Sequence, residues 1–225
     1  MQKPMLWGAA IAIACGSTGA HSNVVVVKSL GPSAKAYPPG RTLPETAKIT
    51  LQGGDVVTVI GPSSAQVLRG PGNFDARQVA LSSAAGQRGR FGALRAAELA
   101  HNPGVWDIDP SASGKVCVAE KSNLQLWRAD SEAAITVQIR SADGEARELS
   151  WAAGKTLAAW PGALPLRSGA QYSVEWPDGG EANKLEVVAV ASPPTDLVGT
   201  AQLFIQNGCQ RQLDLLVDSA SKTQK

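Results

Sequence analysis

The stretch "AITVQIRSADGEARELSW" (residues 134–151) decides the fold class, because it places two alternating runs around a turn. In "ITVQIR" (135–140), Ile or Val stands at every second position and the residues between are polar. Such alternation is typical of a strand in an antiparallel sheet with one buried face. The intervening "SADGEA" (141–146) is rich in turn-forming residues. The stretch therefore predicts two antiparallel strands and a mainly β protein.

Working outward, five more short runs of this kind surround the first two. They are "KVCVA" (115–119), "NLQLW" (123–127), "KTLAAW" (155–160), "QYSVEW" (171–176) and "KLEVVAV" (184–190). Seven short strands between residues 106 and 192 favour an immunoglobulin-like or fibronectin-like β-sandwich. In "LPLRSGAQYSVEW" (164–176), a Leu, Gly169 and Tyr172 ahead of a strand resemble the tyrosine corner of those folds.

Residues 21–73 predict a separate, small β domain. Runs rich in β-branched residues, bounded by Gly and Pro, favour short strands that pair consecutively and antiparallel. The runs are "NVVVVK" (23–28), "KITLQ" (48–52), "VVTVI" (56–60) and "AQVLR" (65–69). Gly53-Gly54-Asp55 supplies the positive-φ residues that a tight turn between two of them needs.

The same region resembles the periplasmic β domain of FecR-like proteins. The resemblance rests on "PPGRTL" (38–43), "ITLQGGDVVTVI" (49–60) and "SAQVLRGPG" (64–72), which place strands, a "GD" turn and a basic-then-Gly turn in that family's order. FecR-like sensors usually join this domain to a membrane helix and a cytoplasmic anti-sigma segment. We find neither here, so the resemblance implies a shared sensing domain without transmembrane signalling. It supplies no site residues.

The remaining segments predict helix and coil. Residues 74–105 are Ala-rich with four arginines (Arg77, Arg88, Arg90 and Arg95), and we expect a partly helical linker there. The alternative is an anion-binding patch for lipopolysaccharide. Residues 193–218 predict a C-terminal helical segment, although the spacing in 209–218 also fits a strand. Residues 219–225 predict a disordered tail.

The N-terminus predicts export. Lys3 precedes an apolar run from Met5 to Cys15, and small residues follow up to Ala20. This order is typical of a secretory signal peptide cleaved after Ala20, which would leave a periplasmic or secreted protein. The alternative is a lipid anchor on Cys15, because "AIAC" (12–15) resembles a lipobox. No apolar run is long enough to span a bilayer. A formal net charge of +2 gives no reason to expect nucleic acid as a partner.

Cleavage would leave two cysteines, Cys117 and Cys209, and two cysteines in an exported protein favour one disulfide. In "KVCVA", Val116 and Val118 share one face and Cys117 points to the other. If the valines face the sandwich core, a disulfide from Cys117 to Cys209 would fasten the C-terminal segment across the outer face of the sheet.

We expect no metal, no cofactor and no catalytic residues. No catalytic or phosphate-binding motif with its structural context is present. The only histidines are His21 and His101, which are too few for a zinc site. "DIDPSASG" (107–114) resembles a calcium loop, but its glycine and final acid are misplaced, so we expect an Asp-Pro turn.

Trp127 and Gln125 are the candidate binding residues. In "NLQLW", alternation directs Leu124 and Leu126 to the core and Gln125 and Trp127 away from it. Trp127 is then either covered by the C-terminal segment or left to contact a partner. The other tryptophans of the sandwich region form either a carbohydrate platform or part of the core. Trp151 lies on the same strand face as Leu149, and Trp176 on the same face as Val174, which favours core for these two.

The sequence thus predicts an exported binding or scaffolding protein without catalytic activity, its partner an unknown envelope protein or polysaccharide. The alternative is a hydrolase that acts on envelope polysaccharide or peptidoglycan through a carboxylate pair. Two acids facing each other across a cleft would favour the hydrolase. A flat surface without an acidic cleft would favour the binding protein.

Overall fold

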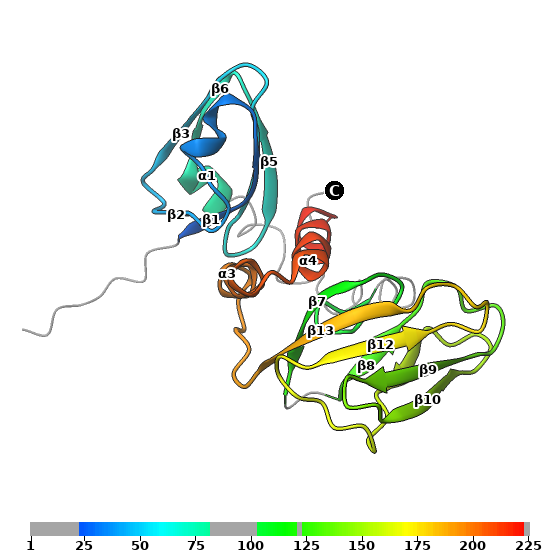
Figure 1. The fold of residues 1–225 in the computed structure, drawn as a ribbon. Coiled ribbons are helices and arrows are strands. Elements are labelled where there is room, and N and C mark those ends of the chain that lie inside the picture. The colour runs from blue at the N-terminus through cyan, green and yellow to red at the C-terminus, as the bar shows by residue number, and fades with distance from the viewer. Residues whose placement is uncertain (1–22, 82–102, 121–122, 223–225) are drawn as a thin grey trace, which may run out of the picture.

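The computed structural model describes residues 23–81, 103–120 and 123–222 (Figure 1). It is mainly β, with 38% strand and 19% helix, and it ends in two short helices, so the predicted fold class is confirmed. The expected signal peptide, Cys15, Ala20 and His21 lie outside the described residues, as do His101 and Arg88, Arg90 and Arg95. No helix in the described ranges has the length and hydrophobicity to cross a bilayer.

The N-terminal unit consists of short strands with two single-turn helices. Its elements are β1 (Val24–Leu30), η1 (Pro32–Lys35), β2 (Thr42–Leu43), β3 (Lys48–Leu51), β4 (Val56–Ile60), β5 (Ala65–Arg69), β6 (Gly72–Asp75) and α1 (Ala76–Leu81). Four strands form a sheet in the order β2-β1-β4-β5, and β3 pairs with β6. All of these pairs are antiparallel, as predicted.

Strand pairing in this unit is only partly consecutive, which corrects the sequence prediction: β4 pairs with β5, but β1 pairs with β4 and β3 pairs with β6. The Gly53-Gly54-Asp55 turn forms, and Asp55 donates its backbone N–H to the carbonyl of Gln52 at 3.1 Å. The strands on either side of the turn, β3 and β4, belong to different sheets. The turn therefore carries the chain from one sheet to the other. Both sheets contribute apolar residues to one shared core.

That core also continues past residue 73, where the sequence pattern predicted the start of a linker. Strand β6 runs to Asp75, and α1 follows directly. The buried side chains of α1, Ala76 and Val79, pack into the core of the N-terminal unit. These apolar residues are spaced three positions apart and form the buried face of α1, which the Ala-rich composition of the segment did not reveal.

A buried carboxylate holds the two turns of this unit together. Asp55 is 1% exposed, and it accepts the backbone N–H of Ser33 at 2.9 Å and that of Gln52 at 2.5 Å. Burial alone would raise the pKa of Asp55, but the hydrogen bonds from Ser33 and Gln52 outweigh it and hold the pKa below its usual value. Gly31, with φ +101°, lies against this carboxylate, and a Cβ there would stand 2.5 Å from Oδ1.

We expect Asp55→Asn to destabilise the protein at neutral pH, because an amide cannot accept both N–H groups. A carboxyl pKa lowered by folding contributes stability above its unfolded-state value of about 3.9 and loses it as pH falls through the folded value. The gap in urea midpoint between variant and wild type should therefore shrink on acidification. The exposed Asp143→Asn is the control. A gap that does not change with pH would contradict the role of the Asp55 charge.

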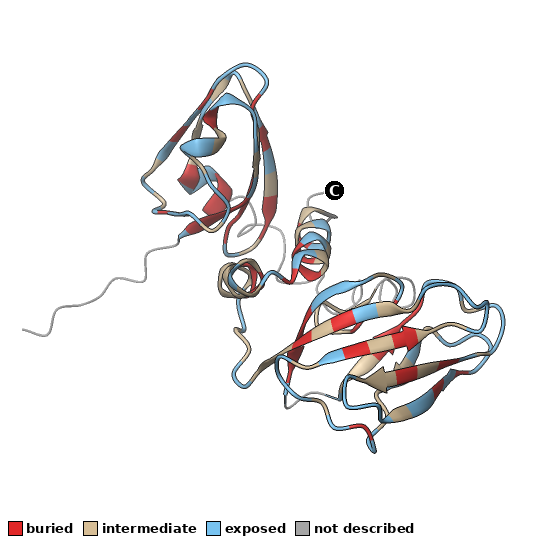
Figure 2. Ribbon diagram, viewed as in Figure 1, coloured by how far each residue is buried: buried red, intermediate tan, exposed pale blue. Residues whose placement is uncertain are grey.

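The second unit contains all seven predicted strands. They are β7 (Gly114–Ala119), β8 (Gln125–Trp127), β9 (Ile135–Ser141), β10 (Ala146–Trp151), β11 (Leu157–Ala159), β12 (Gln171–Glu175) and β13 (Asn183–Val190). One sheet has the order β10-β9-β12-β13-β7, and β11 pairs with β8. Residues buried along β9, β10, β12 and β13 alternate with less buried ones and build one core (Figure 2). The arrangement is sandwich-like.

One pair in this unit departs from the antiparallel pattern. Edge strand β7 runs parallel to β13, with Cys117 opposite Val188. The two strands lie almost seventy residues apart in the sequence, so no turn between them fixes their direction. Alternation identifies a strand and its faces but carries no information on the direction of a distant neighbour.

Tyr172 has the hydrogen bonds expected of a tyrosine corner. Its side chain is 2% exposed. Its hydroxyl donates to the carbonyl of Pro165 at 2.7 Å and accepts the backbone N–H of Arg167 at 3.1 Å. The ring also packs edge-on against Trp160. The "LPLRSGAQYSVEW" segment thus folds back on its own upstream backbone, as its pattern predicted.

The C-terminal segment forms two helices, α3 (Leu197–Asn207) and α4 (Gln210–Lys222). Asp196 caps α3 by accepting the N–H of Gly199 at 2.8 Å. Gly208 ends α3 in the left-handed conformation, with φ 73°. Residues 210–218 are therefore helix rather than strand. The expected tail is corrected too, because helix continues to Lys222 and buries Ala220; residues 223–225 are outside the described ranges.

The helical pair lies between the two β units and contacts both (Figure 1). A third core, separate from the other two, contains Val25 and Ile60 from the N-terminal sheet, Phe204 and Leu213 from the helices, and Cys117 from the second unit. On the N-terminal side, Gln202 of α3 donates to the hydroxyl of Thr42 at 2.8 Å. The helices thus cover apolar residues that each β unit alone would leave in water.

Strand β7 is fastened to the helices twice at Cys117. Cys117 and Cys209 form a disulfide, with Cα atoms 5.8 Å apart, and both residues are fully buried. Val116 and Val118 face the sandwich core, while Cys117 faces the helices. In addition, the Gln212 side chain accepts the Cys117 N–H and donates to its carbonyl, both at 2.7 Å. The Gln212 amide therefore takes the place of a further strand along the free edge of β7.

Replacing Gln212 with leucine should cost roughly 1–3 kcal/mol, because it leaves a buried N–H and a buried C=O without partners. The Gln212 amide is 4% exposed and also donates to the carbonyl of Val105 at 2.8 Å, so water cannot take its place cheaply. Urea unfolding measures the loss, and faster hydrogen exchange at the Cys117 amide would locate it. The exposed Gln206→Leu on α3 is the matched control. Unchanged exchange at Cys117 would refute the role given to Gln212.

Candidate functional site

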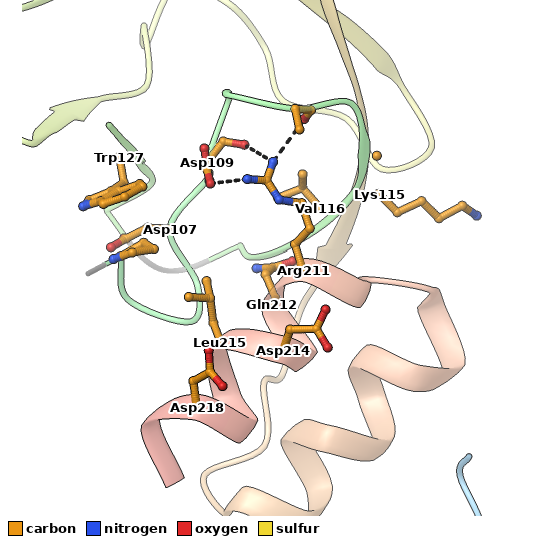
Figure 3. Close-up of a pocket in the computed structure, with 13 residues that line it drawn as sticks. Asp107, Asp109, Lys115, Val116, Trp127, Arg211, Gln212, Asp214, Leu215 and Asp218 are labelled. Carbon is orange, nitrogen blue, oxygen red and sulfur yellow. Dashed lines mark hydrogen bonds and ion pairs between the residues drawn. The ribbon is translucent and has the colours of Figure 1, made fainter. Parts of the chain in front are cut away.

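A groove with a volume of about 320 Å³ lies between α4 and the segment that leads into β7. One wall is the 103–116 segment and the other is α4, with Trp127 of β8 at one end (Figure 3). Because the Cys117–Cys209 disulfide and the Gln212 hydrogen bonds join α4 to β7, the two walls are held in place relative to each other.

The α4 wall follows directly from helical spacing. Arg211, Asp214, Leu215 and Asp218 stand at positions i, i+3, i+4 and i+7, so they lie on one face of the helix. The opposite stripe, with Leu213 and Leu216 among its residues, is buried in the third core. The α4 sequence therefore presents one apolar face to the protein and one charged face to the groove.

Arg211 closes the base of the groove. Its guanidinium forms an ion pair with the Asp109 carboxylate and donates to the Ser111 hydroxyl at 3.1 Å. It also donates to the backbone carbonyls of Asp109 at 3.4 Å and Ala112 at 3.3 Å. Asp109 in turn accepts the N–H of Ser111, which forms the Asp-Pro turn predicted for this segment. Arg211 thus acts as a structural clamp, and its charge is neutralised by Asp109.

Asp107 is a partly buried carboxyl in the groove. Desolvation by burial raises its pKa, and a hydrogen bond from the N–H of Gly104, at 2.7 Å, only partly opposes the rise. Figure 3 places Asp107 beside Trp127 on the wall opposite α4. Asp214 and Asp218 lie on α4 itself and are exposed. The groove therefore has carboxylates on both walls.

Trp127 lines the groove, whereas Gln125, the other candidate binding residue, does not. Trp127 is 9% exposed, and its buried Nε1 has no hydrogen-bond partner in the part of the chain that the structure describes. Gln125 is half-buried, and its backbone carbonyl accepts the N–H of Ile108 at 2.9 Å. Trp127 is therefore mostly buried, and its role in binding stays a prediction.

The remaining tryptophans of the sandwich region pack against other aromatic rings. Trp151 and Trp176 stack with ring centroids 6.2 Å apart, and Trp151 is 1% exposed. Trp160 packs on Tyr172, and Trp106 packs on Phe204 in the third core. A shared carbohydrate platform is thus not what these rings form, and core is the better description of Trp151.

Sequence reasoning missed most residues of the groove. Only Trp127 had been singled out for binding, and 107–114 was predicted as a turn. The signal for the α4 wall is present in the sequence as the 3-4 spacing of Arg211, Asp214, Leu215 and Asp218. That signal could be used only once 210–218 was assigned to helix rather than strand, and nothing in it identifies the 103–116 segment as the opposite wall.

Within the described ranges, no group of three His, Cys, Asp or Glu side chains comes together in a way that could hold a metal ion. Comparison with family models, curated proteins and solved structures finds no match to this chain. The class that the fold and the groove define is therefore a mainly β protein whose two β units are joined by a disulfide-linked helical pair. The FecR-like and immunoglobulin-like resemblances stay predictions.

Proposed function

We propose that this protein is a non-catalytic binding or scaffolding protein of the cell envelope, and that the groove beside α4 is its binding site. The observation that supports this most directly is the construction of the groove, whose two walls are covalently tied through Cys117 and Cys209. A pocket held open by its own scaffold binds with little ordering cost. The charged rim and the aromatic end resemble the few polar groups and apolar lining of small-ligand sites.

The charges around the groove favour a positively charged ligand group. Both nearby cations are already paired, Arg211 with Asp109 and Lys115 with Glu186 at 3.0 Å. Asp214 and Asp218 form no ion pair within the described part of the chain. The unpaired charge around the groove is therefore negative, and it favours a basic side chain or an amine over an anionic polymer as the ligand.

This function predicts that a tetralysine peptide binds the mature protein and that a tetraglutamate peptide does not. Asp214→Asn combined with Asp218→Asn should weaken tetralysine binding by roughly two- to thirtyfold, since exposed ion pairs contribute about 0.2–1 kcal/mol each. Binding should also weaken as pH falls through the raised pKa of Asp107, which then loses its charge. Calorimetry measures both effects, with the exposed Glu148→Gln on β10 as control. Equal binding of the two peptides would refute the proposed site.

A carboxylate-pair hydrolase is the second candidate function, and one observation favours it. Asp107 has a raised pKa, as a general acid requires, and it faces carboxylates across a groove. Against a catalytic role for Asp109, this carboxylate is already ion-paired with Arg211 and stabilises the Asp-Pro turn. Release of reducing ends from purified peptidoglycan decides between the two: activity that disappears in Asp107→Asn would establish the hydrolase, and none in the wild type would leave the binding function.

A further inference from the structure

The outer face of the N-terminal sheet is only partly covered by the helices. The strand register defines rows of side chains that cross β1, β4 and β5 on this face. The first row is Val25, Ile60 and Ala65, and all three residues are buried in the third core beneath the helices. This face of the sheet should therefore stay buried only as far as the helices cover it.

Two further rows extend beyond the helices. The second row is Lys28, Thr58 and Val67, and in it Val67 is 47% exposed. The third row is Leu30, Val56 and Arg69, and in it Leu30 is 55% exposed. Leu30 and Val56 are opposite each other in the register, and Val67 lies diagonally across from Val56, so the three apolar side chains are contiguous.

The uncovered face is flanked by positive charge. Lys28 and Arg69 are exposed and stand in the same two rows as the apolar residues. Neither forms an ion pair within the described part of the chain. The combination of exposed Leu and Val with unpaired cations calls for an occupant that is apolar on one stripe and acidic beside it.

Helix α4 already shows how such an occupant fits. A groove of about 310 Å³ lies between α4 and this sheet, and it is lined by Leu213 and Val217 from α4 and by Val27 and Thr58 from the sheet. Asp214 and Asp218 follow these apolar residues by one position and lie on the same groove as Lys28. The protein thus covers the near part of this face with a helix that carries apolar residues four apart and acids beside them.

We propose that the uncovered face, formed by Leu30, Val56 and Val67 between Lys28 and Arg69, docks an acidic amphipathic helix of a partner protein alongside α4. The partner helix carries two apolar residues four positions apart, each followed by an acid, as α4 does. Anionic lipid is the alternative occupant of this face and is one outcome of the test.

The test uses a side-chain-stapled copy of α4 (residues 210–222) and the mature protein. We expect saturable binding of this peptide by calorimetry, and at least about tenfold weaker binding, or about 1.4 kcal/mol, for Val67→Glu and separately for Arg69→Glu. Leu157→Glu on β11, also an exposed leucine in the wild type, is the matched control and should bind normally. A peptide with both aspartates changed to asparagine should bind more weakly.

Two results would overturn the proposal. One is the absence of saturable binding, or binding that Val67→Glu and Arg69→Glu leave unchanged while thermal melts show both variants to be folded. The other is binding to phosphatidylglycerol vesicles that Arg69→Glu abolishes while the stapled peptide does not bind, since that would assign the face to a lipid surface. The tetralysine titration reports separately on the groove, so failure here is distinguishable from failure of the proposed function.

Discussion

Replacing both Cys117 and Cys209 with serine should lower the free energy of unfolding by up to about 4–5 kcal/mol, the largest loss we expect from any change in this chain. The disulfide closes a loop with a sequence separation of 92 residues. In the chain-entropy model, a crosslink of that span restricts the unfolded chain by this amount, and strain in the folded state subtracts from it. The loss should be felt by both β units, since the helices that the disulfide holds cover apolar residues of each.

Urea unfolding of the double serine variant measures this loss against the oxidised wild type. The reduced wild-type protein is the matched control, because it loses the crosslink and keeps the sulfur atoms. Both should lose a similar amount, and the Gln212 hydrogen bonds to Cys117 should then be what keeps α4 on β7. Free thiols on both cysteines in protein purified from the periplasm, or a variant that unfolds like the wild type, would show the prediction to be wrong.

Local patterns in the sequence predicted the strands well because burial of one sheet face imposes a two-residue period. That period placed Val116 and Val118 in the sandwich core and Cys117 on the other face, where the structure has them. It could not predict which strands pair. Partners such as β3 with β6 and β7 with β13 are chosen by how the whole core closes, and a distant partner leaves no mark on either strand alone.

The groove was beyond sequence reasoning for a related reason. Its two walls are about a hundred residues apart, and they meet because Arg211 reaches the turn that contains Asp109. An arginine and an aspartate at that separation carry no pairwise signal in a single sequence. The raised pKa of Asp107 is also a consequence of burial by neighbours rather than of its own surroundings in the chain.

Trp127→Ala should cost roughly 3–5 kcal/mol, as other large-to-small changes at buried sites do. The ring is 9% exposed and lies at the end of the groove, between the 103–116 segment and α4. Removing it would leave a void that rigid walls cannot fill, since the disulfide fixes one of them. Thermal and urea unfolding of the purified variant measure the cost.

The indole nitrogen makes a sharper test possible. Because Nε1 of Trp127 is buried without a hydrogen-bond partner among the described residues, Trp127→Phe removes no hydrogen bond and should cost less than Trp127→Ala, which removes the whole ring. Trp151→Phe is the matched comparison, since Nε1 of Trp151 donates to the Leu126 carbonyl at 3.2 Å, and its loss should add about 1 kcal/mol or more. If Trp127 were instead a bare binding platform, Trp127→Ala would melt normally and tetralysine binding would fall. Normal melting together with unchanged binding would refute both roles for this residue.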